Sequence, residues 1–302
     1  MKKSVLLLLM MVAAFSGFSQ EDDDQQKSVI QEYTPSKLLQ KGQWDIKFFN
    51  GLYTQTERTD EGRESVTIPR ENFFTNTTEL FTGISDNSRV NIGLIFQVRS
   101  NTFGQGALSV FNFENNTTDA RSGLTTLAPS IRVQPIASVP NFSFTSSLFF
   151  PLFKDQPNAP YLDKRSVFWE TKFFFDKTFG GGNWQIFTEA DFGFNFGEKS
   201  EDADPQTSNI PERFANNSMF LPISAFLSYF PSDKSTVFVN AQQAYLIDLG
   251  NNFSQNYTQL GFGTKYQLTK VLNVEASFNK IVTGANFQGL GQTFSLGLRT
   301  LF

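Results

Sequence analysis

The 302-residue chain contains no cysteine and no histidine. Without cysteine there is no disulfide framework, no thiol nucleophile, no iron–sulfur cluster and no lipid-modified cysteine behind a signal peptide. Without histidine there is no imidazole base and no ordinary zinc or copper site, so only carboxylates, lysine and tyrosine remain for proton transfer. These absences argue against an enzyme, and we expect neither a cofactor nor a bound metal.

Basic residues are also fewer than acidic ones. Lysine and arginine number 25 against 29 aspartates and glutamates, and the formal net charge is −4. Proteins that bind nucleic acid carry a basic surface that neutralises phosphates. Nucleic acid is therefore not an expected partner.

Long apolar runs are missing except for one at the N-terminus. Lys2 and Lys3 precede an unbroken apolar run over residues 5–15, and Gly17 and Ser19 place small residues before a cut after Ser19. This order is typical of a secretory signal peptide, so residues 1–19 are predicted to be cleaved during export through the inner membrane. An uncleaved anchor is the alternative, but the run is too short for a spanning helix of about 20 residues.

Phenylalanine, in contrast, is abundant at 36 residues, and apolar side chains often occupy every second position. In the last segment, residues 294, 296, 298 and 302 are apolar, while residues 293, 295, 297 and 299 are polar or glycine. Alternation of this kind predicts a β-strand with one apolar and one polar face.

The same alternation recurs along the chain and predicts about twelve strands, with turn residues between them. They are expected at 43–57, 72–85, 89–101, 122–135, 141–153, 165–178, 184–197, 216–230, 235–248, 256–268, 271–282 and 290–302. Tight links at 86–88, 136–140, 180–183, 231–234 and 269–270 take strict turns with longer ones at 58–71, 102–121, 154–164, 198–215, 249–255 and 283–289.

Strict alternation of link length favours an all-β fold, a closed antiparallel transmembrane β-barrel over residues 43–302. Such barrels have even strand numbers, short periplasmic turns and longer extracellular loops. A soluble β-sandwich is the alternative, but it has no reason to sort its links by length or to use such long strands.

The aromatic residues of the apolar face gather at both ends of the predicted strands. Such rings are expected at the two membrane interfaces, which a soluble aromatic core would not explain. We therefore expect the bacterial outer membrane, with its lipids around the barrel. One girdle comprises Trp44, Phe142, Phe175, Trp184, Tyr229, Tyr266 and Phe302, and the other Phe150, Trp169, Phe194, Tyr245 and Phe294.

The chain ends within its last strand on an aromatic residue. Phe294, Leu296, Leu298 and Phe302 resemble the C-terminal recognition signal of outer-membrane β-barrel proteins. That resemblance implies the barrel assembly machinery as a partner. More broadly, residues 34–44, 49–55 and 227–234 are similar to a poorly characterised family of outer-membrane barrels, loosely grouped with small-solute porins and transporters. This resemblance implies fold and location rather than activity.

Residues 20–42 fall outside the strand pattern and are expected to form a periplasmic N-terminal segment. Residues 21–24 are an acidic tail. Thr34 is placed to cap a short helix, with Pro35 in its first turn and Gly42 just beyond its end. This segment is expected either to act as a small plug in the periplasmic mouth or to anchor beneath the barrel.

Charged residues on the polar faces are the candidate pore-lining residues. Facing lipid, a midplane arginine or lysine would cost about 2–4 kcal/mol, so these side chains are assigned to the lumen. They either form a paired network that fills the barrel or line a constriction, in which arginines attract anions and carboxylates attract cations. The set is Asp45, Lys47, Glu79, Arg99, Arg132, Glu170, Lys172, Asp176, Glu189, Asp191, Lys265, Glu275 and Arg299.

Three hypotheses follow for function. The first is a passive or weakly selective channel for small solutes. The second is a non-conducting structural subunit of an outer-membrane assembly, secretion or adhesion complex, with other outer-membrane proteins as partners. The third is a conduit for hydrophobic solutes, because inward positions also carry Phe49, Phe81, Phe149, Phe174, Phe220 and Phe226.

The loop 198–215 offers several oxygen ligands close together. Glu198, Glu201, Asp202 and Asp204 could approach a calcium ion. Their spacing is not that of an EF-hand loop, so we predict a solvated outward loop.

Overall fold

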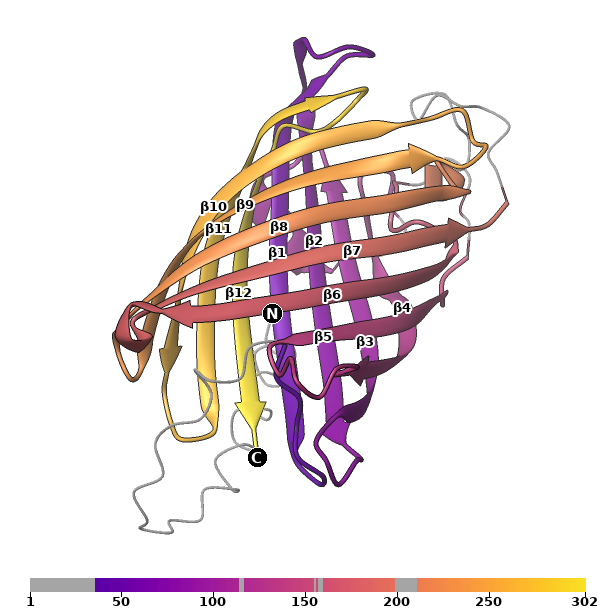
Figure 1. Cartoon of the computed structure of the whole chain (residues 1–302). Coiled ribbons are helices and arrows are strands. Elements are labelled where there is room, and N and C mark those ends of the chain that lie inside the picture. Colours follow the sequence, from indigo (N-terminus) through magenta and orange to yellow (C-terminus); the bar gives the residue numbers. More distant parts are fainter. Residues whose placement is uncertain (1–35, 114–116, 155, 157–159, 199–210) are drawn as a thin grey trace.

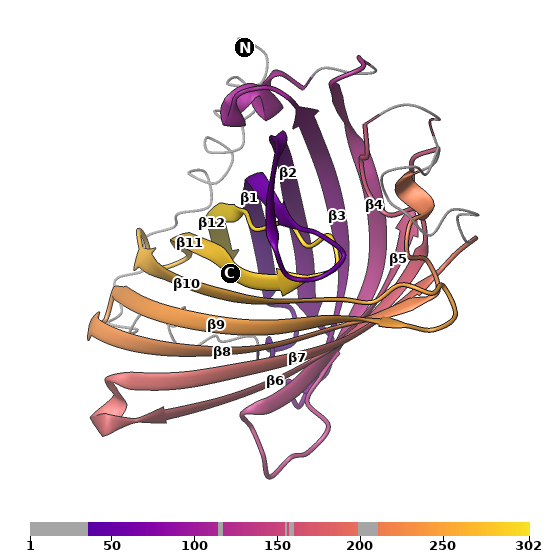
Figure 2. The same ribbon diagram turned by 90° about the horizontal axis from the view of Figure 1, so that it is seen from above.

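The computed structural model describes residues 36–113, 117–154, 156, 160–198 and 211–302. Within them the chain forms a closed antiparallel barrel of twelve strands, each paired with its neighbours in sequence, and β1 pairs with β12 (Figures 1 and 2). The strands are β1 (Trp44–Thr59), β2 (Ser65–Gly83), β3 (Val90–Phe103), β4 (Ala120–Val133), β5 (Phe142–Pro151), β6 (Val167–Phe179), β7 (Trp184–Phe196), β8 (Ser218–Ser232), β9 (Ser235–Asp248), β10 (Gln255–Gln267), β11 (Leu272–Ala285) and β12 (Gln292–Leu301). The predicted fold is thus confirmed.

Closure depends on the pairing of the first strand with the last. Asp45 pairs with Leu301 and Thr54 with Gln292 at the two ends of this seam. Beyond the seam, the Trp44 amide donates to the Phe302 carbonyl at 2.7 Å, and the Phe302 amide donates to the Trp44 carbonyl at 3.0 Å. The sheet therefore has no unpaired edge, as a sheet surrounded by lipid requires.

The outward faces are apolar and the inward faces hold a small core. Trp44, Trp169 and Phe302 are among many large apolar side chains left exposed on the outside, at 44%, 46% and 50%. Inside, Leu39, Phe81, Ile95, Ala128, Phe149 and Leu301 form one buried cluster. No helix among the described residues is long and apolar enough to cross a membrane.

Strands β1 and β2 are longer than predicted, and the prediction of a loop over residues 58–71 is wrong. Their pairing continues across a bulge between Gln55 and Glu57, and the link is only 60–64. Pro69 lies beside this bulge, which accommodates a residue without an amide donor. Strict alternation of link length therefore fails: 104–119, 152–166 and 197–217 are long, whereas 60–64, 249–254 and 286–291 at the same end are short. We call this the long-loop end and the other the short-turn end.

The helix expected up to Gly42 is also wrong for the described residues 36–42, which are not helical. Lys41 forms an isolated bridge with Gly83, and the Gly42 amide donates to the Gly83 carbonyl at 3.0 Å. A Cβ on Gly83 would lie 2.0 Å from the Gln40 carbonyl oxygen, so this approach requires glycine. Pairing with the end of β2 thus replaces helical hydrogen bonds. The segments 1–19 and 20–35 lie outside the described residues.

The closing seam generates a prediction about biogenesis. Deleting Phe302 or making Phe302→Asp should lower the outer-membrane level of folded, heat-modifiable protein several-fold. Both changes alter the end of the strand that closes the sheet, and the second puts a charge on its apolar face. Leu108→Asp is the control, because Leu108 is 71% exposed and lies outside the strands. Undiminished folded protein in both Phe302 variants would contradict this prediction.

Candidate functional site in the barrel interior

A first cluster of charges surrounds Asp45, which has no exposed surface. Arg299 donates to it through Nε at 2.7 Å and Nη2 at 2.9 Å. Lys47 Nζ lies 3.9 Å and Arg132 Nη1 4.0 Å from its Oδ2. Lys47 also reaches Glu79 at 3.2 Å. Since β1 and β4 are not neighbours, Asp45 and Arg132 meet across the interior, so one aspartate holds three cations together there.

A second cluster reverses these signs around Lys172. Its ammonium lies 3.2 Å from Asp191, 3.4 Å from Glu189 and 3.6 Å from Glu170. Lys172 pairs in register with Asp191 on β7, and Glu170 lies two residues before it on the same face of β6. Here one cation holds three carboxylates together.

The remaining predicted charges also have partners. Lys265 and Glu275 pair at 3.0 Å between β10 and β11. Arg99 Nε lies 3.0 Å from Asp163, a residue that the sequence did not single out. Asp176 accepts from the Ser36 hydroxyl and from Gln185 Nε2, so it holds the N-terminal segment to the wall. The sequence analysis offered two arrangements, a paired network or a constriction lined by charges. The contacts described here are those of paired charges.

Residues 160–166 lie inside the barrel, although the sequence predicted an outward loop over 154–164. Asn101 Nδ2 donates to the Tyr161 carbonyl at 2.7 Å and to the Leu162 carbonyl at 2.9 Å. Leu162 is 2% exposed and Asp163 pairs with Arg99. The fold thus uses polar side chains of β3 to hold the backbone of a link that joins β5 to β6.

A buried ion pair secures the same region. Arg121 donates to the Glu212 carboxylate, to the Pro160 carbonyl at 3.3 Å and to the Lys154 carbonyl at 2.8 Å. Glu212 is completely buried in the short helix Pro211–Arg213. A guanidinium has five donors in a fixed fork, which suits three acceptors from two links. Sequence analysis missed both residues; an arginine at the end of a strand was the available signal.

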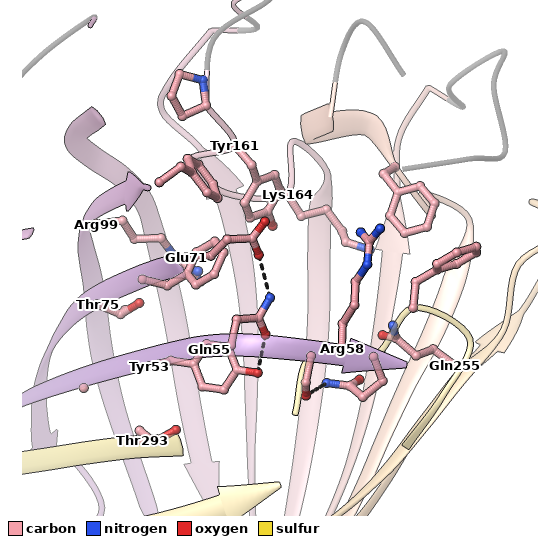
Figure 3. Close-up of a pocket in the computed structure, with 18 of the residues that line it drawn as sticks. Tyr53, Gln55, Arg58, Glu71, Thr75, Arg99, Tyr161, Lys164, Gln255 and Thr293 are labelled. Carbon is pink, nitrogen blue, oxygen red and sulfur yellow. Dashed lines mark hydrogen bonds between the residues drawn. The ribbon is translucent and has the colours of Figure 1, made fainter. Parts of the chain in front are cut away.

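Two interior cavities adjoin these residues at the long-loop end. One has a volume of about 850 Å³ and the other about 610 Å³, and both are lined by Arg99, Tyr161, Lys164 and Gln255. The smaller cavity also reaches Glu79, Glu170 and Lys172. Figure 3 shows Arg58 and Lys164 extending into the larger one. The interior is therefore hollow from the long loops towards the Lys172 cluster.

Lys164 and Tyr161, which lie outside the strands, have shifted ionisation. Burial lowers the pKa of Lys164 to about 8, and the neighbouring Asp163 offsets only part of this effect. Burial likewise raises the pKa of the Tyr161 phenol. At pH 7 Lys164 therefore keeps its charge, while Tyr161 remains a neutral hydrogen-bond donor.

Packing is uneven around the interior. Asn91, Ala128 and Ser143 on β3 to β5 have no exposed surface. On β9 to β11, several inward polar side chains are only partly buried, although Phe238 and Ala244 are buried. Asn240, Gln242, Gln259 and Asn279 are half-buried, and the Lys265 side chain is 43% exposed. Asn240 donates to Asn279 at 2.9 Å across Gly261, where a Cβ would lie 1.9 Å from the Asn279 amide oxygen. Polar amides of β9 to β11 are therefore accessible from the interior, whereas Asn91, Ala128 and Ser143 are tightly packed.

The described residues contain no group of three or more histidine, cysteine, aspartate or glutamate side chains that could hold a metal ion. In the loop 198–215, residues 199–210 lie outside the described part of the chain. Of its described carboxylates, Glu198 pairs with Arg213 and Glu212 with Arg121. The calcium hypothesis for this loop thus gains no support from those two side chains.

Comparison with known proteins gives structural relatives only. No protein-family model matches the chain, and no curated protein matches it. An outer-membrane channel from Pseudomonas putida F1 has 10% identity and a TM-score of 0.63, covering 93% of this chain and 100% of the channel. The β domain of the Bordetella autotransporter BrkA has 11% identity and a TM-score of 0.56, covering 86% and 99%. The chain therefore has the fold of outer-membrane β-barrels.

The Lys172 cluster generates an asymmetric stability prediction. Lys172→Met should lower the free energy of unfolding by roughly 3–5 kcal/mol, because it leaves three carboxylates facing one another without a cation. Asp191→Asn should cost clearly less, because Glu170 and Glu189 still pair with Lys172. The urea midpoint of unfolding in detergent measures both. Equal losses, or a larger loss for Asp191→Asn, would mean that the charges are not coupled through Lys172.

Proposed function

We propose that this protein is an outer-membrane channel through which small solutes diffuse passively or with weak selectivity. The observation that carries the proposal is the hollow interior, with two cavities at the long-loop end and half-buried polar side chains on β9 to β11. Eight-stranded barrels are filled by side chains and sixteen-stranded ones leave an aqueous channel. Accessible polar side chains inside twelve strands therefore favour a water-filled path over a filled scaffold. The fold shared with an outer-membrane channel is consistent with this proposal.

The charged clusters have different roles in this proposal. The groups around Asp45 and Lys172 are structural ion-pair networks, in which the paired charges satisfy one another. Solutes pass along β9 to β11, where Lys265 and Glu275 present one charge of each sign. Because opposite charges face the same path, neither anions nor cations are strongly favoured. The predicted paired network and the predicted constriction then belong to different halves of the interior.

The N-terminal segment narrows the short-turn mouth in this proposal. Leu39 is 1% exposed and packs in the core cluster with Phe81, while the Ser36 hydroxyl donates to Asp176. These contacts join residues 36–42 to β2 and β6. The segment therefore acts as a small plug that is also anchored to the wall.

We also propose the location and partners that the sequence predicted. The signal peptide 1–19 is removed on export, the short-turn end lies in the periplasm, and the apolar outer face contacts outer-membrane lipids. The barrel assembly machinery reads the pattern from Phe294 to Phe302. We propose no catalytic activity, because the chain lacks histidine and cysteine.

A second candidate is a conduit for hydrophobic solutes. Neighbouring rings connect Phe174, Phe187, Phe226 and Phe238 along the inner wall, with centroid separations of 5.9, 5.6 and 6.0 Å. Such a row offers a continuous apolar surface beside the polar one. Uptake of a neutral hydrophobic solute by vesicles that contain the protein would favour this candidate.

The channel proposal predicts current whose selectivity depends on the β10–β11 pair. In planar bilayers under a salt gradient, the reversal potential reports whether anions or cations pass more easily. Glu275→Gln should shift it in the direction of anion selectivity, and Lys265→Gln in the direction of cation selectivity. Lys177→Gln, exposed on the outward face of β6, is the control and should leave the reversal potential unchanged. Absence of current from correctly folded protein would instead favour the non-conducting structural subunit.

The proposed orientation predicts which residues are accessible from outside the cell. Gly106→Cys, in the link 104–119, should react with an impermeant thiol reagent on whole cells, and Ser232→Cys, beside the tight β8–β9 turn, should not. Both residues are exposed, so differences in labelling report membrane sidedness. The native chain has no cysteine and is its own control. Labelling of Ser232→Cys alone would reverse the orientation.

A further inference from the structure

The larger cavity contains positive charges that no described carboxylate pairs with. Arg58 enters it from the end of β1, and Lys164 enters it from the link 152–166 (Figure 3). Among the described residues, neither side chain has a carboxylate within ion-pair distance, whereas Arg99 in the same cavity pairs with Asp163 at 3.0 Å. The cavity therefore has two cations available for a ligand.

The local contacts of these two cations are weak. Arg58 Nε is buried and has no hydrogen-bond partner among the described residues, and its guanidinium carbon lies 5.8 Å from the centre of the Phe287 ring. Lys164 Nζ donates to the Ala215 carbonyl at 3.3 Å. Arg58 interacts electrostatically with Glu71 and Lys164 with Asp163, but neither carboxylate lies within ion-pair distance. A bound anion would supply the close anionic partner that these half-buried cations lack.

Glu71 is the one carboxylate among the residues that line this cavity. It accepts a hydrogen bond from Gln55 Nε2 at 2.5 Å, and Gln55 in turn accepts from the Tyr53 hydroxyl at 2.6 Å. Figure 3 shows this chain of contacts along one side of the cavity. Glu71 is thus engaged by the wall, and its charge disfavours ligands that carry more than one negative charge.

Aromatic rings form much of the remaining wall. They include Tyr53, Phe73, Phe103, Tyr161, Phe253 and Phe287. Phe73 contacts Phe103 edge to face at 5.6 Å, so part of this surface is packed in advance. Ligand cavities commonly pair such apolar walls with a few placed polar groups, and about 850 Å³ is ample for a single-ring solute.

We propose that this cavity is a binding site for small organic monoanions that carry an aromatic or alkyl group, such as aryl-substituted carboxylic acids. The carboxylate lies between Arg58 and Lys164, and the apolar part packs against the rings. Charge-assisted hydrogen bonds to guanidinium and ammonium groups fix the anion, and the rings remove the apolar part from water.

The state of Lys164 at neutral pH agrees with this site. Although burial lowers its pKa to about 8, the ammonium is still mostly protonated at pH 7. Asp163 next to it is already paired with Arg99, and Glu71 is engaged by Gln55. An incoming carboxylate therefore meets a charged and incompletely satisfied donor.

The biological use of this site rests on the proposed channel function. The cavity shares Arg99, Tyr161, Lys164 and Gln255 with the smaller cavity, which leads towards Lys172. The site then concentrates amphipathic anions at the long-loop entrance before they pass inward. Binding itself does not require transport, so the two proposals can be tested separately.

Calorimetric titration of the full-length protein in detergent at pH 7 tests the site, with 3-phenylpropionate as the probe. We expect saturable binding, and Arg58→Gln or Lys164→Gln should each raise the dissociation constant at least about tenfold, as expected when a charge-assisted contact is lost. The matched controls are Arg63→Gln, on the exposed tip of the same hairpin, and Lys154→Gln, exposed in the same link. Both controls should bind as the native protein does.

The ligands 3-phenylpropanol and acetate separate the contributions of charge and ring, and each should bind at least about tenfold more weakly than 3-phenylpropionate. Unchanged affinity in a heat-modifiable, folded Arg58→Gln/Lys164→Gln double variant would overturn the site, as would equal affinity for the alcohol or for acetate. Binding without bilayer current would keep this site and reject the channel. Current without binding would do the reverse.

Discussion

The requirement that every backbone amide and carbonyl be paired within the sheet governs this structure. Lipid offers no hydrogen-bond partner, so a sheet in a membrane must close on itself. Here closure joins β1 to β12 and leaves Phe302 exchanging hydrogen bonds with Trp44. Once the sheet is closed, alternation sends every second side chain inward, and the protein has to accommodate its polar residues inside a narrow cylinder.

Ion pairing is how the interior accommodates these charges. A lone buried charge is costly, but Asp45 faces three cations and Lys172 faces three carboxylates, so each centre is surrounded by the opposite sign. The signs of the charges in the second cluster are the reverse of those in the first. The first is built from β1, β2, β4 and β12 and the second from β6 and β7, while β9 to β11 carry polar amides and the Lys265–Glu275 pair.

At the long-loop end, links between strands fold into the barrel interior. Asn101 and Arg121 satisfy backbone carbonyls of the segment 152–166, and Arg121 also pairs with Glu212 from the next link at this end. These contacts divide the entrance into two connected cavities. The same inward folding places Lys164 in the aromatic-lined cavity that Arg58 also enters. The entrance therefore combines residues from the strands, such as Arg58 and Phe73, with residues from the links, such as Tyr161 and Lys164.

The sequence by itself determined the barrel, because an alternation with period two is a local property that survives into the sheet, as from Phe294 to Leu298. The same alternation predicted which charged residues point inward. Their partners depend on neighbours distant in sequence, so only the tertiary structure joined Asp45 to Arg132. Because proline is unusual within a strand, Pro69 argued against the continuation of β2 that the structure shows. No local sequence pattern indicates that Leu162 and Lys164 pack inside the barrel. Local patterns fix the strands, whereas closure and loop packing decide the site.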